Sequence, residues 1–249
     1  MPLSTLWADR LLGHALLGEA LNAPATWLIS PIRGYPGAPS GWSEPIPQGT
    51  GRRPVTFANA AQGRIAPTSA LDLGIADSDW GDIDHLAGFE SEQASEPAWW
   101  CPLSLTYRVR KGDRVHIPSD SWSLSFAGGV SIGEANRLLE AIFRGSVLHA
   151  AAPVLALLTS VPVGDAYDEL ELSGLHRSTL SLTRQAPARL ANLSPCAWGT
   201  PGSPATVTHL AALDPDDGRL RYFAPAQASA LVPGHPLTAA AGALTLSLA

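Results

Sequence analysis

The chain of 249 residues has little basic charge and little sulfur. Lys111 is its one lysine, Asp and Glu outnumber Lys and Arg 22 to 16, and the formal net charge is −6. Because phosphate binding needs a concentrated excess of basic charge, we expect no nucleic-acid partner. The two cysteines, Cys101 and Cys196, are too few for a disulfide framework or a zinc site, so we expect two buried thiols.

The sequence also lacks a long apolar run. The apolar stretch at residues 150–158 is too short to span a bilayer. The first 21 residues carry Asp9, Arg10 and Glu19 among their leucines, unlike the uninterrupted apolar core of a signal peptide. We therefore expect neither a membrane partner nor secretion through an oxidising compartment.

Proline and glycine are abundant, with 22 and 23 residues. This composition favours short strands and irregular turns over long helices. Turn signals such as Asp217-Gly218 recur between apolar runs, as they do in sandwiches and jelly rolls. The sequence therefore predicts a mainly β protein.

The chain resembles itself at a spacing of half its length. Residues 11–18 align with residues 138–145, and both segments end in glycine and carry the apolar stripe of a helix. Ser131 precedes Glu134 by three positions, the spacing of a capping box. Five further matches follow in the same order: residues 24–30 with 153–159, Arg53 with Arg177, His85 with His209, Gly112 with Gly234, and the alternating strands 122–126 with 244–248.

These matches predict a tandem duplication with its boundary at Gly128-Gly129. The first copy would cover residues 1–127 and the second residues 131–249. Each copy is expected to be a β-sandwich domain of the jelly-roll type, opened by an N-terminal α-helix.

No catalytic or metal-binding arrangement stands out. His85 and His209 lie in apolar strands, where a histidine hydrogen-bonded to a backbone carbonyl explains them better than a catalytic base. Glu169 and Glu171 share one face of an expected strand without differentiated surroundings. Residues 214–218 read as a turn, because they lack the spaced ligands of a calcium loop. We therefore expect no enzyme activity, cofactor or metal.

The 8 tryptophans lie mostly in the first half. Trp27, Trp80 and Trp122 are expected in the core. Adjacent Trp99 and Trp100 cannot both point inward from a strand, so at least one ring should face solvent or a partner. We assign both, together with Trp42, to a partner interface, and keep stacking on a sugar ring as the alternative.

Short motifs resemble those of small structural proteins of tailed bacteriophages, the tail-fibre-related or fibre-adaptor type. The second half has an Arg177 preceded by Glu-Leu-Ser-Gly, then Thr208-His209 and an Asp217-Gly218 turn; the first half has Trp80-Gly81 and Gly112-Asp113. The resemblance implies a β-sandwich piece of the virion, assembled in the host cytoplasm, without catalytic residues.

The predicted function is thus a non-enzymatic virion structural protein at the tail, neck, fibre attachment or head surface. Its partners would be other virion proteins and further copies of itself, and a cyclic trimer would present six similar lobes. The alternative is a carbohydrate-binding module that recognises a receptor glycan.

Overall fold

The computed structural model of the protein describes residues 2–38, 41–46, 51–126, 128–148 and 151–247. Within them the chain is mainly β, as predicted, and one helix precedes the strands of each half. The first half contains α1 (Thr5–Leu17), β1 (Trp27–Gly34), β2 (Trp42–Ser43), β3 (Arg53–Val55), β4 (Arg64–Ile65), β5 (Leu71–Ile75), β6 (Gly81–Phe89), β7 (Trp99–Val109), β8 (Arg114–Ile117), the 3-10 helix η1 (Ser119–Ser121) and β9 (Leu124–Ser125).

The second half also has one α-helix followed by strands. It contains α2 (Ile132–Arg144), β10 (Val154–Leu158), β11 (Ser178–Thr179), β12 (Leu182–Ala186), β13 (Arg189–Asn192), β14 (Cys196–Gly199), β15 (Ala205–Leu213), β16 (Leu220–Leu231), β17 (Leu237–Ala239) and β18 (Thr245–Ser247).

Both predicted helices are present with the same caps. The Ser4 side chain accepts a hydrogen bond from the Trp7 N–H at the start of α1, and the Ser131 side chain accepts one from the Glu134 N–H at the start of α2. Left-handed glycines, at positions 18 and 145, end the two helices. The predicted capping box is half formed, because the Glu134 carboxylate bonds strand residues instead of returning to Ser131.

The main antiparallel sheets of the two halves have matching strand orders. In the first half the order is β3-β1-β6-β7, with β2 also paired to β1, and in the second it is β11-β10-β15-β16. His85 opposes Pro102 in the first sheet, and His209 opposes Pro225 in the second. A β-bulge lies directly before each histidine. The two sheets therefore share the order of four strands and the bulge before the histidine.

The smaller sheets match as well. β5 pairs with β8 as β14 pairs with β17, and β4 pairs with β9 as β13 pairs with β18. A bulge interrupts β5 between Asp72 and Gly74, and another interrupts β14 between Ala197 and Gly199. Gly74 and Gly199 have φ values of 82° and 99°, a conformation that favours glycine at both places.

The ladders correct one of the sequence matches. Ile32 of β1 opposes His85 and Leu158 of β10 opposes His209, so β1 and β10 correspond at a spacing of 126 residues. The sequence comparison had aligned this region at a spacing of 129. The two runs are mostly apolar and lack an alternating pattern, so their sequences do not fix the register.

The predicted terminal strands are shorter than expected. Residues 122–126 contribute β9 and residues 244–248 contribute β18, although Leu248 lies outside the described residues. Leu124 is buried, whereas Leu246 is half-buried.

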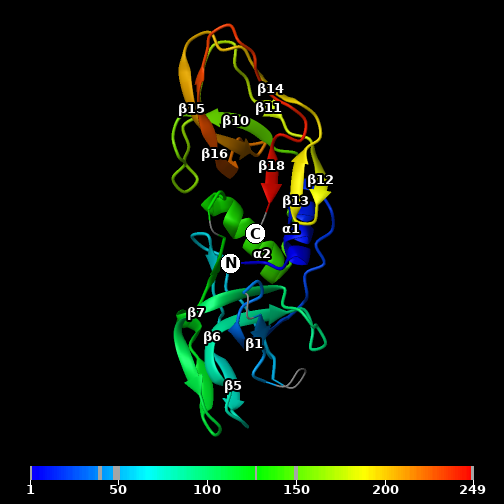
Figure 1. The fold of residues 1–249 in the computed structure, drawn as a ribbon, viewed down its shortest axis with the longest axis vertical. Coiled ribbons are helices and arrows are strands. Elements are labelled where there is room, and N and C mark those ends of the chain that lie inside the picture. The colour runs from blue at the N-terminus through cyan, green and yellow to red at the C-terminus, as the bar shows by residue number, and fades with distance from the viewer. Residues whose placement is uncertain (1, 39–40, 47–50, 127, 149–150, 248–249) are drawn as a thin grey trace.

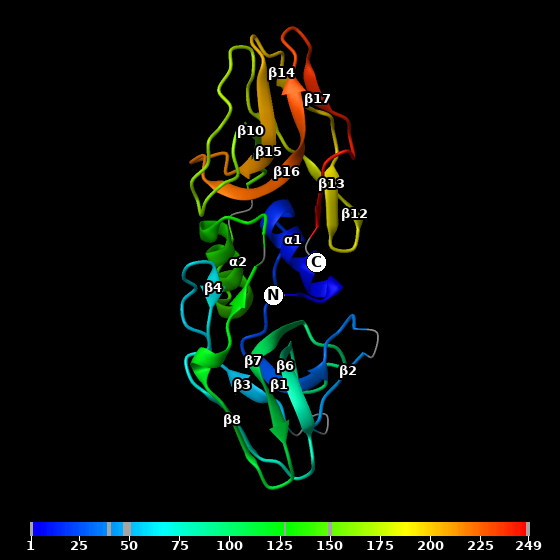
Figure 2. The ribbon, with the colours of Figure 1, turned by 60° about the vertical axis from the view of Figure 1, so that its left-hand side comes forward.

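Each helix packs against a hairpin of the other half. Asp9 of α1 accepts a hydrogen bond through Oδ1 from the Ala188 N–H (3.1 Å), at the turn between β12 and β13. Asn136 of α2 accepts one through Oδ1 from the Gly63 N–H (2.8 Å), at the turn before β4. Asp9 and Asn136 occupy the same position in their helices. Figures 1 and 2 show the two helices in the middle of an elongated molecule, with one main sheet toward either end.

The ends of the helices are held across the same boundary. The Trp27 indole of the first half donates to the Ile142 carbonyl of α2 (3.0 Å). The Arg221 guanidinium of the second half donates to the Ala15 carbonyl of α1 (2.9 Å). Ala15 and Ile142 are again equivalent helix positions, so the contact between the halves is close to self-complementary.

Arg221 also belongs to a buried ion pair. Its side chain and that of Glu134 are both buried, and Nη2 lies 3.0 Å from Glu134 Oε1. The Tyr222 hydroxyl donates to the same carboxylate oxygen (3.0 Å). Burial, reinforced by the charge of Glu134, raises the pKa of Tyr222 well above its usual value, so this hydroxyl stays protonated as a donor.

One apolar core runs through both halves, so the two predicted domains, linked at Gly128-Gly129, do not have separate cores. It includes Trp27 and Trp99 from the first half, Leu190 and Trp198 from the second, and the inner faces of both helices. Ala127, the last residue of the predicted first domain, lies outside the described residues. Domain boundaries normally lie where few contacts cross between two parts of a chain. Here the apolar faces of the helices contact the other half, so many contacts cross the middle of the chain.

The described strands do not confirm the predicted jelly-roll arrangement. Each half has one larger sheet and two smaller ones, instead of the two four-stranded sheets of a jelly roll. Bulges and glycines interrupt the smaller ladders, which keeps them short.

Candidate interaction site

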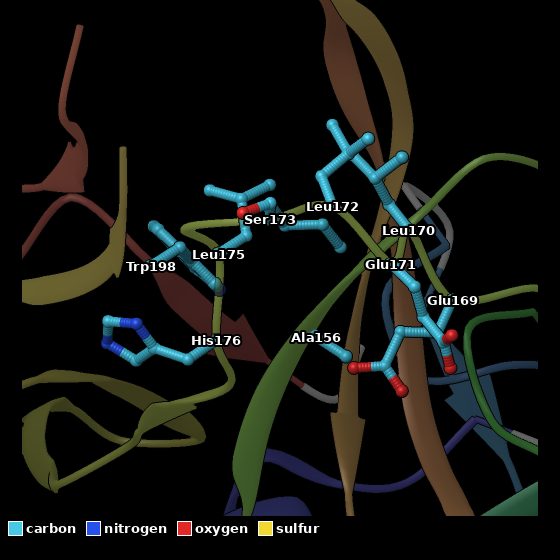
Figure 3. A pocket seen from close by; sticks show the side chains of 10 residues that line it. Ala156, Glu169, Leu170, Glu171, Leu172, Ser173, Leu175, His176 and Trp198 are labelled. Atoms are coloured by element: carbon cyan, nitrogen blue, oxygen red, sulfur yellow. The ribbon is translucent and has the colours of Figure 1, made fainter. Parts of the chain in front are cut away.

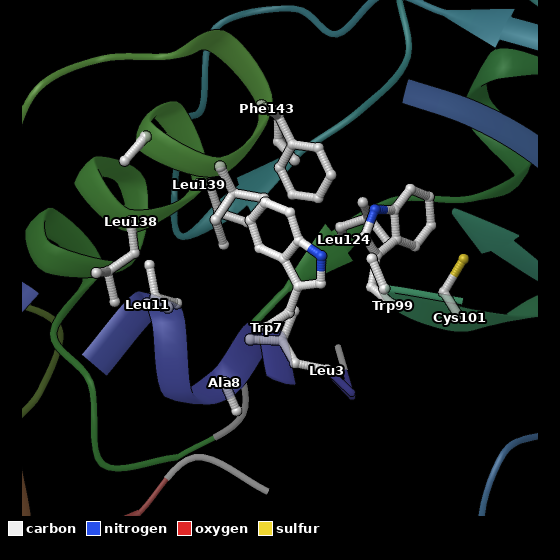
Figure 4. Close-up of a cluster of buried hydrophobic side chains, with 14 of the residues drawn as sticks. Leu3, Trp7, Ala8, Leu11, Trp99, Cys101, Leu124, Leu138, Leu139 and Phe143 are labelled. Atoms are coloured by element: carbon white, nitrogen blue, oxygen red, sulfur yellow. The ribbon is translucent and has the colours of Figure 1, made fainter. Parts of the chain in front are cut away.

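Trp99 lies in the core, so it is not part of a partner interface as the sequence analysis proposed. Its side chain is 0% exposed, and its ring packs 6.0 Å from Trp27 and 5.5 Å from Phe143, centroid to centroid. Figure 4 shows it across from Trp7 of α1 and near Phe143 of α2. Gly88 on the neighbouring strand makes room for the ring, since a Cβ there would lie 2.0 Å from Trp99 Cε2. Trp27, Trp80 and Trp122 are buried, as predicted.

Trp100 and Trp42 lie on the opposite face of the same sheet and are half-buried. Both pack against a small second cluster of buried side chains that contains Ile32, Ala87 and Phe89. The Trp42 and Phe89 rings are 6.0 Å apart. Strand alternation separates the neighbours Trp99 and Trp100, as expected, and the assignment to an interface stays a prediction for Trp100 and Trp42.

A pocket of about 460 Å³ opens beside Trp100. We call it the Trp100 pocket. The start of α1, the turn after β1, the loop between β6 and β7, and Trp100 itself form its walls. Its apolar lining comes from Leu3, Leu6, Trp7, Pro36, Pro97 and Trp100.

Two carboxylates add charge to the Trp100 pocket. Glu90 Oε1 accepts hydrogen bonds from the Trp7 indole (2.5 Å) and from Arg10 Nη1 (3.0 Å). Glu96 lies at the same pocket and is exposed. Apolar rings beside carboxylates suit recognition of a side chain or sugar that is apolar on one side and polar on the other.

A second pocket, of about 320 Å³, lies in the second half over the buried ring of Trp198. Figure 3 shows Glu169 and Glu171 on one side of it and His176 on the other. The two glutamates do line one site, but their segment forms only an isolated bridge and no strand. Glu169 is held by Arg177, whose Nε and Nη2 donate to it at 3.0 and 2.7 Å. That hydrogen bonding raises the pKa of the Arg177 guanidinium and gives Glu169 a structural partner instead of a catalytic role.

The Glu–Arg pair recurs in the first half. Arg52 donates through Nε and Nη2 to Glu44 (3.0 and 2.8 Å), in the same side-on geometry and with the same sequence separation. There the pair is buried, and the Arg52 guanidinium packs 3.5 Å from the centre of the Phe89 ring. The sequence analysis missed this match because it paired Arg177 with Arg53. A glutamate eight positions before an arginine in both halves was the available signal.

The equivalent histidines lie beside polar side chains and not beside the backbone carbonyls expected, and the buried Nδ1 of His85 makes no hydrogen bond to any described residue. His85 Nδ1 lies 2.9 Å from Asp84 Oδ1, and its ring packs against Tyr35. His209 Nδ1 lies 3.1 Å from the Thr208 hydroxyl.

The described residues contain no cluster of three or more His, Cys, Asp or Glu side chains that could hold a metal ion. Residues 214–218 form the predicted turn, between β15 and β16. In the part of the chain that the structure describes, no helix is long and apolar enough to cross a membrane.

Both cysteines are free and buried, as predicted. Burial raises the pKa of the Cys101 thiol from 9.0 to about 12. The unfolded chain releases this proton at lower pH than the folded one, so Cys101 makes stability fall as pH rises above 9.0. Tyr222, with its raised pKa, adds to the fall above pH 10.0.

We expect the free energy of unfolding to drop by up to about 1.4 kcal/mol per pH unit for each of the two groups. Urea unfolding from below pH 9.0 to above pH 10.0 measures this slope. Cys101→Ala should flatten its first part, and Tyr222→Phe its second. A free energy that stays constant over this range would show that neither group is held protonated by the fold.

The first half of the chain matches a known family. Residues 2–125 match the family model described as Podophage GP4 fiber I protein gp80. The match begins just before α1 and ends at the last residue of β9. None of the curated proteins matches the chain. The family match supports a phage fibre-related structural protein.

Proposed function

We propose that the protein is a non-enzymatic structural component of a phage virion that attaches fibres, at the tail, the neck or the head surface. The observation that carries the proposal is the match of residues 2–125 to a phage fibre family. Two Glu–Arg pairs that fix loops support a structural role for these polar residues. The protein would act by presenting complementary surfaces to other virion proteins.

Deleting the gene from the phage tests this proposal. Particles from the deletion strain should lack an appendage that electron microscopy resolves on wild-type particles, and supplying the gene in trans should restore it. Complete, infective particles from the deletion strain would contradict the proposal.

We further propose that the chain is a tandem duplication of one fibre-family unit. The recurring ladders, bulges, helix caps and Glu–Arg pairs support it, because unrelated segments have no reason to share irregularities. Each helix packs against a hairpin of the other half. The two copies would therefore pair in the way that the subunits of a symmetric dimer pair. Residues 1–127 and 131–249 would then be two copies that complete each other's core.

Circular permutation tests the paired-copy arrangement. The ends of the chain marked N and C lie close together in both views (Figures 1 and 2). A permutant that joins the natural termini with a short glycine link and opens at Gly128-Gly129 should unfold at nearly the wild-type temperature. A permutant opened within β6 is the control and should fail to fold. Equal loss of stability in both would contradict the arrangement.

We also propose that copies of the chain form a cyclic trimer, which would display six similar lobes to symmetric partners. Light scattering over a range of concentrations should give three times the chain mass of 26.0 kDa. A mass of one chain at every concentration would exclude the trimer in solution.

A further inference from the structure

We propose that the Trp100 pocket binds an extended segment of another virion protein in which an arginine or lysine stands next to an apolar residue. The inference rests on the proposed function, because it assigns a partner to the structural protein. Three features of the pocket carry it: its shape, its charge and its aromatic wall.

The shape of the pocket suits a chain segment, because the second half fills the matching place with one of its own. There residues 163–166 form a turn against the start of α2, and Asp165 Oδ1 accepts a hydrogen bond from the Gly133 N–H (2.7 Å). Gly133 has the position in α2 that Leu6 has in α1. In the first half Leu6 is 55% exposed, and the cavity of about 460 Å³ lies beside it.

The charge of the pocket indicates a basic ligand. In the second half the loop between β15 and β16 carries Arg219, which lies close to Asp214 and Asp217, whereas the loop between β6 and β7 of the first half carries Glu96. The first half thus presents the exposed Glu96, beside Glu90, which is already bonded to Arg10. A segment that enters there meets carboxylates, in a chain whose net charge is −6, so a cationic side chain is favoured.

The wall of the pocket already holds one arginine in the proposed manner. The Arg10 guanidinium lies 5.2 Å from the centre of the Trp7 ring while it bonds Glu90 at 3.0 Å. Trp100 and Glu96 offer the same combination of aromatic ring and carboxylate to a side chain from outside. Such a pair gains from both the cation–π interaction and the ion pair.

The test uses the full chain and an array of short overlapping peptides from the other structural proteins of the purified particle. Bound peptides should contain arginine or lysine beside an apolar residue. For the best peptide, measured by fluorescence anisotropy, Glu96→Arg and Trp100→Ala should each weaken binding by about tenfold or more. Glu171→Arg, at an exposed carboxylate of the second half, is the matched control and should bind as the wild type does. Thermal unfolding checks that all three variants remain folded.

Two results would overturn the inference: no peptide bound, or binding that Glu96→Arg and Trp100→Ala leave unchanged. A glycan array tests the alternative ligand. If no peptide binds but a glycan does, and Trp100→Ala abolishes that binding, the pocket binds a sugar instead. If the chain is present in purified particles, such results remove only this inference. If the chain is absent from particles, the proposed function itself fails.

Discussion

Replacing Glu134 by alanine should lower the free energy of unfolding by about 3–5 kcal/mol, because it leaves Arg221 buried without its counter-ion. Both side chains are almost completely enclosed, and Arg221 joins β16 to the carbonyl end of α1. The loss would be a large part of the stability of a typical protein. Urea unfolding of the full chain measures it.

The matched control is Arg114→Ala, which removes an exposed partner of Asp72 and should barely move the transition. The double variant Glu134→Leu with Arg221→Met should recover part of the loss, since two apolar side chains leave no charge buried. If Glu134→Ala behaved like Arg114→Ala, the ion pair would not be a buried link between the helices.

Replacing Trp99 by alanine should cost about 3–5 kcal/mol, since it empties the centre of the aromatic cluster that joins the first sheet to both helices. The ring lies between Trp27, Trp122 and Phe143. Trp100→Ala, one residue along the strand, is the natural control, and its half-exposed ring should cost clearly less. The intensity of tryptophan fluorescence during urea unfolding reports both variants.

Equal losses for Trp99→Ala and Trp100→Ala would contradict the assignment of Trp99 to the core. The comparison also bears on partner binding. Trp100→Ala should keep the fold and weaken ligand binding at the Trp100 pocket. Trp99→Ala should lower stability. Comparing the two variants therefore distinguishes an effect on stability from an effect on binding.

Much of the local structure could be predicted from the sequence. The glycine after each apolar stripe predicted where α1 and α2 end, and Ser131 predicted where α2 begins. Asp217-Gly218 predicted the turn between β15 and β16. These features depend on a few neighbouring residues, whose conformational preferences act locally.

The arrangement of the halves could not be predicted in the same way. The apolar stripe of α1 could be buried against its own half or against the other half. The spacing of its apolar residues is the same in both cases, so it does not predict which half covers it. Asp9 accepts a hydrogen bond from the Ala188 N–H of the other half, and nothing in the sequence around Asp9 indicates this contact. For this reason the sequence did not predict the core that the two halves share.

The candidate site was predictable only in part. Alternation along the strand correctly required that Trp99 and Trp100 face opposite ways, but it could not say which ring is buried. Gly88 on the neighbouring strand decides this, because only a residue without a side chain leaves room for the Trp99 ring. The Trp100 pocket combines segments from four places in the sequence, and such a combination has no local signature.

Mass spectrometry of purified particles tests the central claim, that the chain is a structural component of the virion, most directly. Particles banded on a density gradient should contain peptides from both halves of the chain, in a fixed ratio to the other structural proteins from one preparation to the next. If the protein occurs only in the soluble fraction of infected cells and never in banded particles, the claim is wrong.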